Sequence, residues 1–409
     1  MADSIYGFRV RQARTLRGRA SGDLAKVLGW SASKLTRVEA ADSLQIGGEE
    51  LRALSDNLQY PTDFFLHPGT DLNYGDLLFR APKSTPKREQ QFLADYAAVT
   101  GDFLAWLDSL HRLPNVRLPQ PLDMVGVGES SVSFAQIKTL AQDCRAAMNL
   151  SKGMPAPYLT HELERLGVVV IVRSRGLQRS DPDVWDKDAI SLENHVGYST
   201  WVGDHRDRPV IILRSLDSWE RTRWTLAHEL GHLVLHRNAP TLEKEQDAST
   251  FASEFLAPID ALEEELPRSI TLTTLLPLKL KWGLSIYALL RHLLRGDLIT
   301  NERYKSMTDQ LHVRRNAETG RTWRRDEPGW DAREPERPAI IRTWCERCLG
   351  TTDSGALQML SKRWPSDFLD ELLATQRSSA KRSNHVRNLG PAVEAGVVDM
   401  FSRRKRSTG

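Results

Sequence analysis

The chain has 409 residues, of which 56 are Lys or Arg and 53 are Asp or Glu, so its net charge is only +3. At roughly 100–200 residues per domain, this length predicts two or three domains. The balanced charge excludes a chain-wide basic surface, so nucleic-acid binding would need a local patch. No secretory signal, no membrane-spanning apolar run and only three cysteines are present, and we therefore expect a cytoplasmic protein without a membrane partner.

The first part of the chain, residues 5–66, is a run of short helical patterns interrupted by glycines. Residues 24–31 combine the end of one helix, a Gly-containing turn and the start of another. Residues 31–39 then predict a helix whose Leu35 and Val38 face inward. If this helix enters the major groove of double-stranded DNA, its outward residues are the candidate contacts. These are Ala32, Ser33, Lys34 and Arg37.

Several arginines nearby add positive charge that could meet phosphates. They are Arg9, Arg11, Arg14, Arg17 and Arg19. The alternative is a helical bundle kept for dimerisation or for docking a protein partner, so a homodimer stays open.

Further along, residues 86–112 show apolar side chains at helical spacing and predict an amphipathic helix. Residues 111–129 hold three prolines and two glycines and are the candidate linker. Beyond them we expect a mixed α/β region. Its elements are helices over about 133–150, 158–166, 219–236 and from about 242 to Pro258, and strands over 168–172 and 210–213. Residues 259–372 are mostly helical, and the polar, basic end from 377 predicts a flexible tail.

The sharpest signal is His228-Glu229-Leu230-Gly231-His232. On a helix, residues four apart share one face, so both imidazoles can reach one ion, with Glu229 beside a water that the ion binds. Zn²⁺ suits these ligands and lowers the pKa of such a water to about 7. Glu229 would then take a proton and pass it to the leaving amine. The alternative is a pair of hydrogen-bonded core histidines.

A third ligand should come from the next helix. Glu245 shares the stripe of Phe251 and Ala252, and Asp247, four residues before Phe251, is the runner-up. The alternative for either acid is a carboxylate that stabilises a helix N-terminus. His236, one turn beyond the motif, is expected to be exposed at the end of its helix, where a cation suits the helix dipole.

Residues 223–236 and the segment Glu245-Gln-Asp-Ala-Ser-Thr-Phe-Ala-Ser-Glu-Phe-Leu-Ala-Pro258 resemble the ImmA/IrrE family of metallo-endopeptidases. The resemblance implies His228 and His232 as zinc ligands, Glu229 as catalytic acid and base, and Glu245 as third ligand. It also implies cleavage of a regulatory protein, a helix-turn-helix repressor or an antitoxin. Residues 8–66 resemble XRE-type (phage-repressor) helix-turn-helix domains, although Ala20-Ser21 stands where that family usually has Thr-Gln.

We thus expect an α+β multidomain chain: an all-α helix-turn-helix bundle, a zincin-like domain with a small sheet and the HExxH helix, and a helical C-terminal region. The expected boundaries are 1–68 for DNA binding, 69–118 for a helical linker, 119–300 for the zinc peptidase, 301–372 for an accessory region and 373–409 for the tail. The alternative function is a non-catalytic transcription regulator or antitoxin whose zinc domain only senses or binds. Cys345 and Cys348 form an isolated CxxC, expected to be reduced thiols on a helix.

Overall fold

The computed structural model describes residues 2–77, 87–119, 132–173, 197–237, 244–330 and 332–373. They lie in one compact unit, Met1–Thr375. Nearly all of the expected tail and part of the expected linker fall outside the described residues. Within the described ranges, no helix combines the length and the apolar character needed to cross a bilayer.

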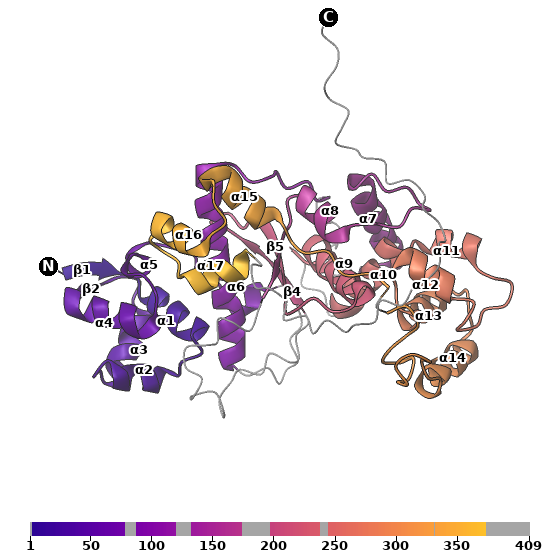
Figure 1. The fold of residues 1–409 in the computed structure, drawn as a ribbon, viewed down its shortest axis with the longest axis horizontal. Coiled ribbons are helices and arrows are strands. Elements are labelled where there is room, and N and C mark those ends of the chain that lie inside the picture. The colour runs from indigo at the N-terminus through magenta and orange to yellow at the C-terminus, as the bar shows by residue number, and fades with distance from the viewer. Residues whose placement is uncertain are drawn as a thin grey trace, which may run out of the picture. The chain divides into compact units, whose positions relative to one another are not determined.

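The N-terminal part is helical, with one short antiparallel strand pair (Figure 1). Its elements are β1 (Ala2–Ile5), α1 (Gly7–Leu16), α2 (Ser21–Val27), α3 (Ala32–Ala40), β2 (Leu44–Gly47), α4 (Gly48–Leu58) and α5 (Thr62–Leu66). The β1–β2 pair corrects the expectation of an all-α bundle. Strands of four residues carry too little alternation to be recognised in a sequence, and burial of Ile5 and Ile46 holds them in the core.

Helix α6 (Lys87–Leu110) follows the short 3₁₀ helix η1 (Tyr74–Asp76) and is largely buried. It packs against the C-terminal helices α15 (Ile340–Leu349), α16 (Ser354–Ser361) and α17 (Ser366–Leu372) in one apolar core. The ring of Tyr96 lies 6.0 Å from that of Phe368, and the ring of Phe103 lies 5.2 Å from Trp364. The two ends of the described chain therefore share a core.

A three-stranded sheet lies between this core and a second one. Its order is β3 (Val169–Val172), β5 (Arg208–Leu213) and β4 (Gly197–Val202), with β3 parallel and β4 antiparallel to β5. Alternate residues serve the two cores: Ile212 faces the first, and Ile211 faces the second. Burial on both faces explains why β3 and β5 are continuous apolar runs.

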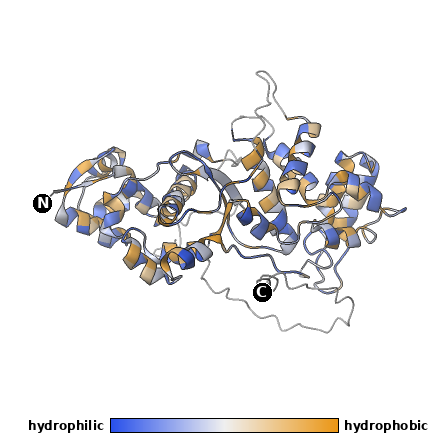
Figure 2. Cartoon of the chain, turned by 90° about the horizontal axis from the view of Figure 1, so that it is seen from above, coloured by the Kyte–Doolittle hydropathy of each residue, from blue (hydrophilic) through white to orange (hydrophobic). Residues whose placement is uncertain are grey.

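The second core is made of helices on the other face of the sheet. They are α7 (Phe134–Ala147), α8 (Leu159–Arg165), α9 (Trp219–Leu235), α10 (Lys244–Leu256), α11 (Ile259–Glu265), α12 (Leu276–Trp282), α13 (Ile286–Arg295) and α14 (Asn301–Val313). Figure 2 shows apolar and polar residues interspersed along the helical ribbons. α9 lies between β4 and β5 on one side and α10 on the other, which makes it the central helix of this half.

Candidate metal centre

Helix α9 carries the His-Glu-x-x-His motif over its last three turns. The Ser218 hydroxyl caps its first turn by accepting a hydrogen bond from the backbone N–H of Arg221. Apolar side chains at Leu226, Leu230 and Leu233 are fully buried and fix the rotation of the helix about its axis. The motif is therefore held by core packing and does not depend on the polar residues alone.

Three side chains converge at this place. Nε2 of His228 lies 3.2 Å from Oε2 of Glu245, Nε2 of His232 lies 3.4 Å from Oε1 of the same carboxylate, and the two Nε2 atoms are 3.1 Å apart. In the described part of the chain, this is the one group of three His, Cys, Asp or Glu residues whose ligand atoms lie close enough to share an ion.

The spacing can be tested against a metal. Zinc in a tetrahedral site lies about 2.0–2.1 Å from its nitrogen and oxygen ligands, which separates two such ligands by about 3.3–3.4 Å. The three observed separations, 3.1, 3.2 and 3.4 Å, are close to the edges of that tetrahedron. The Glu245 side chain is 41% exposed whereas His232 is 0% exposed, so the group is walled on one side and open on the other, as a catalytic site requires.

A glycine allows the two helices to approach. A Cβ atom at Gly231 would lie 3.1 Å from the Phe251 ring and 3.2 Å from the Cα of Ala248 on α10. These separations are tighter than ordinary van der Waals contact, so a larger residue would push α10 away. Glu245 lies one turn before Ala248, and its position against the two histidines depends on this close approach.

The runner-up acid has another partner. Asp247 is buried and places Oδ2 3.8 Å from Nε2 of His236, away from the two motif histidines. Nδ1 of His236 lies 2.9 Å from Nδ1 of His232. The expectation that His236 is exposed was wrong, because this side chain is buried behind His232 and burial lowers its pKa.

Each motif histidine thus has a partner on its other nitrogen. Ser249 Oγ lies 3.4 Å from Nδ1 of His228, and His236 fills the same role for His232. Such contacts fix the orientation of an imidazole and leave Nε2 free for a ligand. Burial lowers the pKa of His232 to about 4, so its imidazole is neutral near pH 7. Burial opposes ionisation of Glu245, but hydrogen bonds with both histidines hold its pKa well below the usual range.

Glu229 sits beside this group and contacts the sheet. Its Oε2 accepts a hydrogen bond of 2.8 Å from the Ser199 hydroxyl on β4, and both residues are buried. Burial raises the pKa of Glu229 to about 7, although the charge of His228 and the Ser199 hydrogen bond act in the opposite direction. Sequence reasoning missed Ser199 because β4 was not predicted, although the aromatic and β-branched residues of 197–202 were a usable strand signal.

With this geometry described, the chain can be compared with known proteins. Residues 163–294 match the family Peptidase_M78, the IrrE N-terminal-like domain. The matched segment includes the sheet strands β3, β4 and β5 and both helices of the His-His-Glu group. It supports the ImmA/IrrE resemblance and a metallopeptidase-like domain over this part of the chain. A comparison with curated proteins finds no relative.

All four predicted DNA contacts lie on α3. Ala32, Ser33 and Arg37 are exposed, whereas Lys34 is half-buried, with Nζ 2.5 Å from Glu50 Oε1. The helix begins after Ser31, whose hydroxyl accepts a hydrogen bond from the backbone of Lys34. Leu35 and Val38 face the core as expected.

Most of the arginines expected to meet phosphates are engaged within the protein. Arg9 and Arg17 are buried and bind Asp102 and Asp367. Arg14 pairs with Glu39, and Arg11 pairs with Asp71 and Asp95. Burial of Arg9 and Arg17, which also donate to backbone carbonyls, argues against phosphate contact for these two, whereas for the half-buried Arg11 and Arg14 it stays a prediction.

Cys345 and Cys348 lie on α15 as free thiols, the first buried and the second half-buried. Within the described residues, no metal-binding group includes them.

Proposed function

We propose that the segment around α9 and α10 is a zinc-dependent endopeptidase. The observation that supports it is the convergence of His228, His232 and Glu245, with Glu229 at its edge. His228 and His232 would hold the ion through Nε2, and Glu245 would complete the protein ligands; Asp247 instead serves His236. A zinc ion in this setting supplies a strongly acidified water and polarises a carbonyl.

The remaining steps belong to residues of this chain. Glu229 accepts a proton through its carboxylate and returns it to the amine that leaves. The Ser199 hydroxyl positions that carboxylate by binding Oε2. His236 and Ser249 hold the imidazoles of His232 and His228 in place. The reaction hydrolyses the peptide bond to a carboxylate and an amine, with no covalent intermediate on the protein.

Substitution of Glu229 by Gln tests the proposal. The variant should keep its zinc, measured by elemental analysis, and lose cleavage, because Gln cannot carry the proton. The matched control is Glu254→Gln, which changes a buried carboxyl of α10 outside the metal centre and should leave cleavage intact. A substrate screen would use neighbouring gene products, with helix-turn-helix repressors and antitoxins as the first candidates. If Glu229→Gln functioned as well as the wild type, the result would favour a regulator that only binds or senses.

We also propose that α2 and α3 bind double-stranded DNA. The support is two short helices joined by a Gly29 turn, with α3 presenting Ala32, Ser33 and Arg37 to solvent. Arg37 is the exposed cation among the four candidates. Arg37→Ala should weaken binding to DNA from upstream of the gene in a fluorescence anisotropy assay, whereas Arg52→Ala on α4 should not. Equal losses for both variants would point to general charge and would argue against groove recognition.

A further inference from the structure

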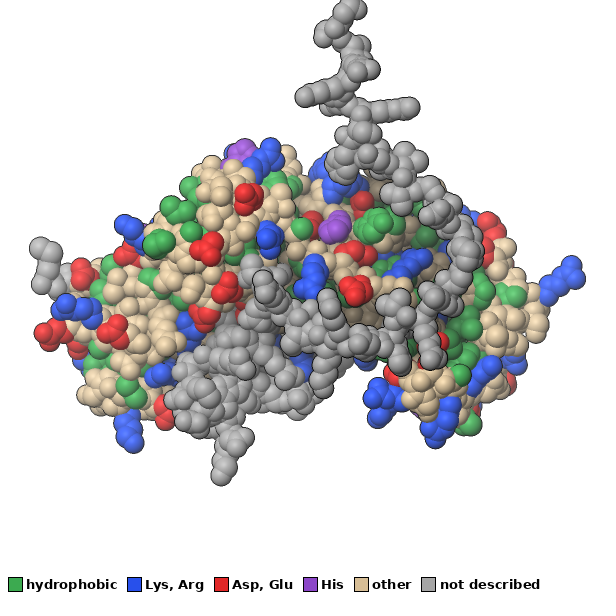
Figure 3. Space-filling model, viewed as in Figure 1, with side chains coloured by type: hydrophobic (Ala, Val, Ile, Leu, Met, Phe, Trp, Pro, Cys, Tyr) green, Lys and Arg blue, Asp and Glu red, His purple; other side chains and the backbone are tan. Residues whose placement is uncertain are grey.

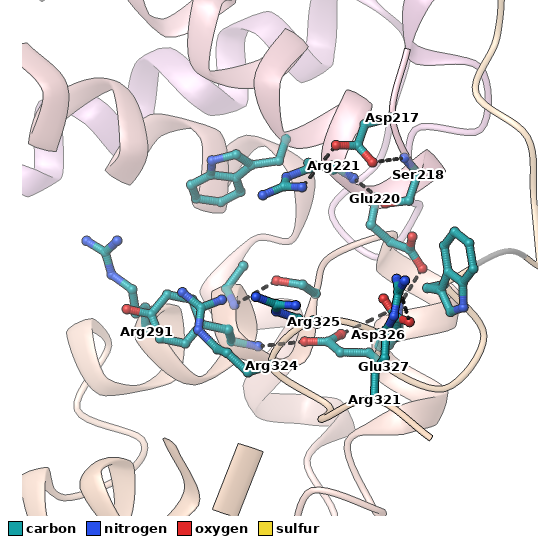
Figure 4. A pocket seen from close by; sticks show the side chains of 16 residues that line it. Asp217, Ser218, Glu220, Arg221, Arg291, Arg321, Arg324, Arg325, Asp326 and Glu327 are labelled. Carbon is teal, nitrogen blue, oxygen red and sulfur yellow. Dashed lines mark hydrogen bonds and ion pairs between the residues drawn. The ribbon is translucent and has the colours of Figure 1, made fainter. Parts of the chain in front are cut away.

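A second concave site lies at the other end of α9. A cavity of about 560 Å³ opens among the first turns of α9, the start of α13 and the segment 321–330 (Figure 4). This volume is in the range of small-molecule sites. His228, His232 and Glu245 do not line it, so it is distinct from the candidate metal centre.

The floor of this cavity is a closed ionic network. Nζ of Lys279 lies 2.5 Å from Glu220 and 3.6 Å from Glu327, and all three side chains are buried. Glu327 also accepts the backbone N–H groups of Ile286 and Tyr287 at the start of α13. Two carboxylates and one ammonium give this network a formal charge of −1, and each carboxylate already has a partner in the protein.

The rim carries a surplus of positive charge. Two of its arginines pair with rim acids, since Arg221 lies 3.0 Å from Asp217 and Arg321 lies 3.5 Å from Asp326. Three more line the cavity and are exposed: Arg291, Arg324 and Arg325. Among the residues that the structure describes, these three have no carboxylate within ion-pair distance; Figure 4 draws them along the lower wall. Figure 3 shows further Lys and Arg side chains over the region of α14.

Aromatic rings complete the walls. Trp224 and Trp330 both line the cavity, and Trp330 is 38% exposed. The Tyr287 ring is already covered by Arg324, whose guanidinium carbon lies 4.3 Å from the ring centre. Free guanidinium groups match phosphate oxygens in a bidentate manner, and open indole rings stack on planar bases.

We propose that this cavity binds a nucleotide, with its phosphates on Arg291, Arg324 and Arg325 and its base against an indole ring of the wall. The site does not depend on the proposed peptidase activity. The cavity adjoins the candidate metal centre along α9, because Trp224 lies one helical turn before His228 on the same face of this helix. Binding here would therefore act on the helix that carries both motif histidines.

Isothermal titration of the full chain with ATP, GTP, CTP and UTP tests the proposal, with adenosine and inorganic phosphate as partial ligands. At least one nucleotide should bind more tightly than either partial ligand. The double variant Arg291→Glu with Arg325→Glu should weaken binding at least about tenfold. Arg342→Glu with Arg347→Glu, the same charge change at two exposed positions of α15, should leave it unchanged. If charge reversal prevents folding, Arg291→Gln with Arg325→Gln tests the same contacts.

Three results would overturn the proposal. One is the absence of binding by all four nucleotides at millimolar concentration. Another is equal binding of inorganic phosphate, which would indicate an unspecific anion site. The third is tight binding of a single-stranded oligonucleotide that a mononucleotide cannot displace, which would make this surface a strand-binding one.

Discussion

The His236 side chain offers a sharp test of how the metal centre is held. Nδ1 of His232 lies 2.9 Å from Nδ1 of His236, and the His232 side chain is 0% exposed. With zinc held on Nε2 of His232, the ring proton would lie on Nδ1 and would be donated to Nδ1 of His236. His236→Phe keeps a ring of similar size and removes the acceptor.

The expected effect of His236→Phe on zinc binding can be obtained in two ways. A buried donor left without a partner costs about 1–3 kcal/mol. Loss of a partner behind a metal-binding histidine lowers metal affinity about 10- to 100-fold, equivalent to about 1.4–2.8 kcal/mol. The two ranges agree, so we expect the zinc Kd of His236→Phe to rise about 10- to 100-fold, measured by competition with a chromophoric chelator.

The matched control is His292→Phe. His292 is equally buried and its Nε2 lies 2.9 Å from the carbonyl of Ala257, outside the metal centre. This variant should lower the unfolding temperature and leave the zinc Kd unchanged. A zinc Kd for His236→Phe within about twofold of the wild type would refute the view that His236 positions His232, as would an equal rise in both variants.

Further substitutions test the other contacts described above. Glu245→Gln should raise the zinc Kd by more than about 100-fold, beyond the range of an outer contact, whereas Asp247→Asn should raise it less; the reverse order would make Asp247 the ligand. Gly231→Leu should lower the free energy of unfolding by about 1–3 kcal/mol in urea denaturation, because the side chain meets α10; an unchanged value would contradict the close approach. Burial raises the pKa of Asp95 to about 6, so the folded protein binds this proton more tightly than the unfolded chain does. The stability that results is present at low pH and is lost as the pH rises through about 6. When the pH is raised from 4 to 7.5, the free energy of unfolding of Asp95→Asn relative to the wild type should therefore increase by on the order of 2 kcal/mol. A difference between the two proteins that does not depend on pH would contradict this.

Local patterns in the sequence predicted much of the secondary structure. The apolar spacing around His228 predicted a helix over about 219–236, and α9 covers Trp219–Leu235. The strands near 168–172 and 210–213 were also found, because residues buried on both faces of a sheet form apolar runs. The choice between Glu245 and Asp247 stayed open, since both fall in the first turn of α10.

The placement of two histidines four residues apart on one face of α9 follows from helix periodicity, which is a local property of the sequence. Which acid faces them depends on packing, because it follows from how closely α10 approaches α9 at Gly231. The same holds for His236 behind His232 and for the arginines of α1, whose carboxylate partners include residues as distant as Asp102 and Asp367. Contacts between residues far apart in the chain follow from packing, which no local pattern encodes.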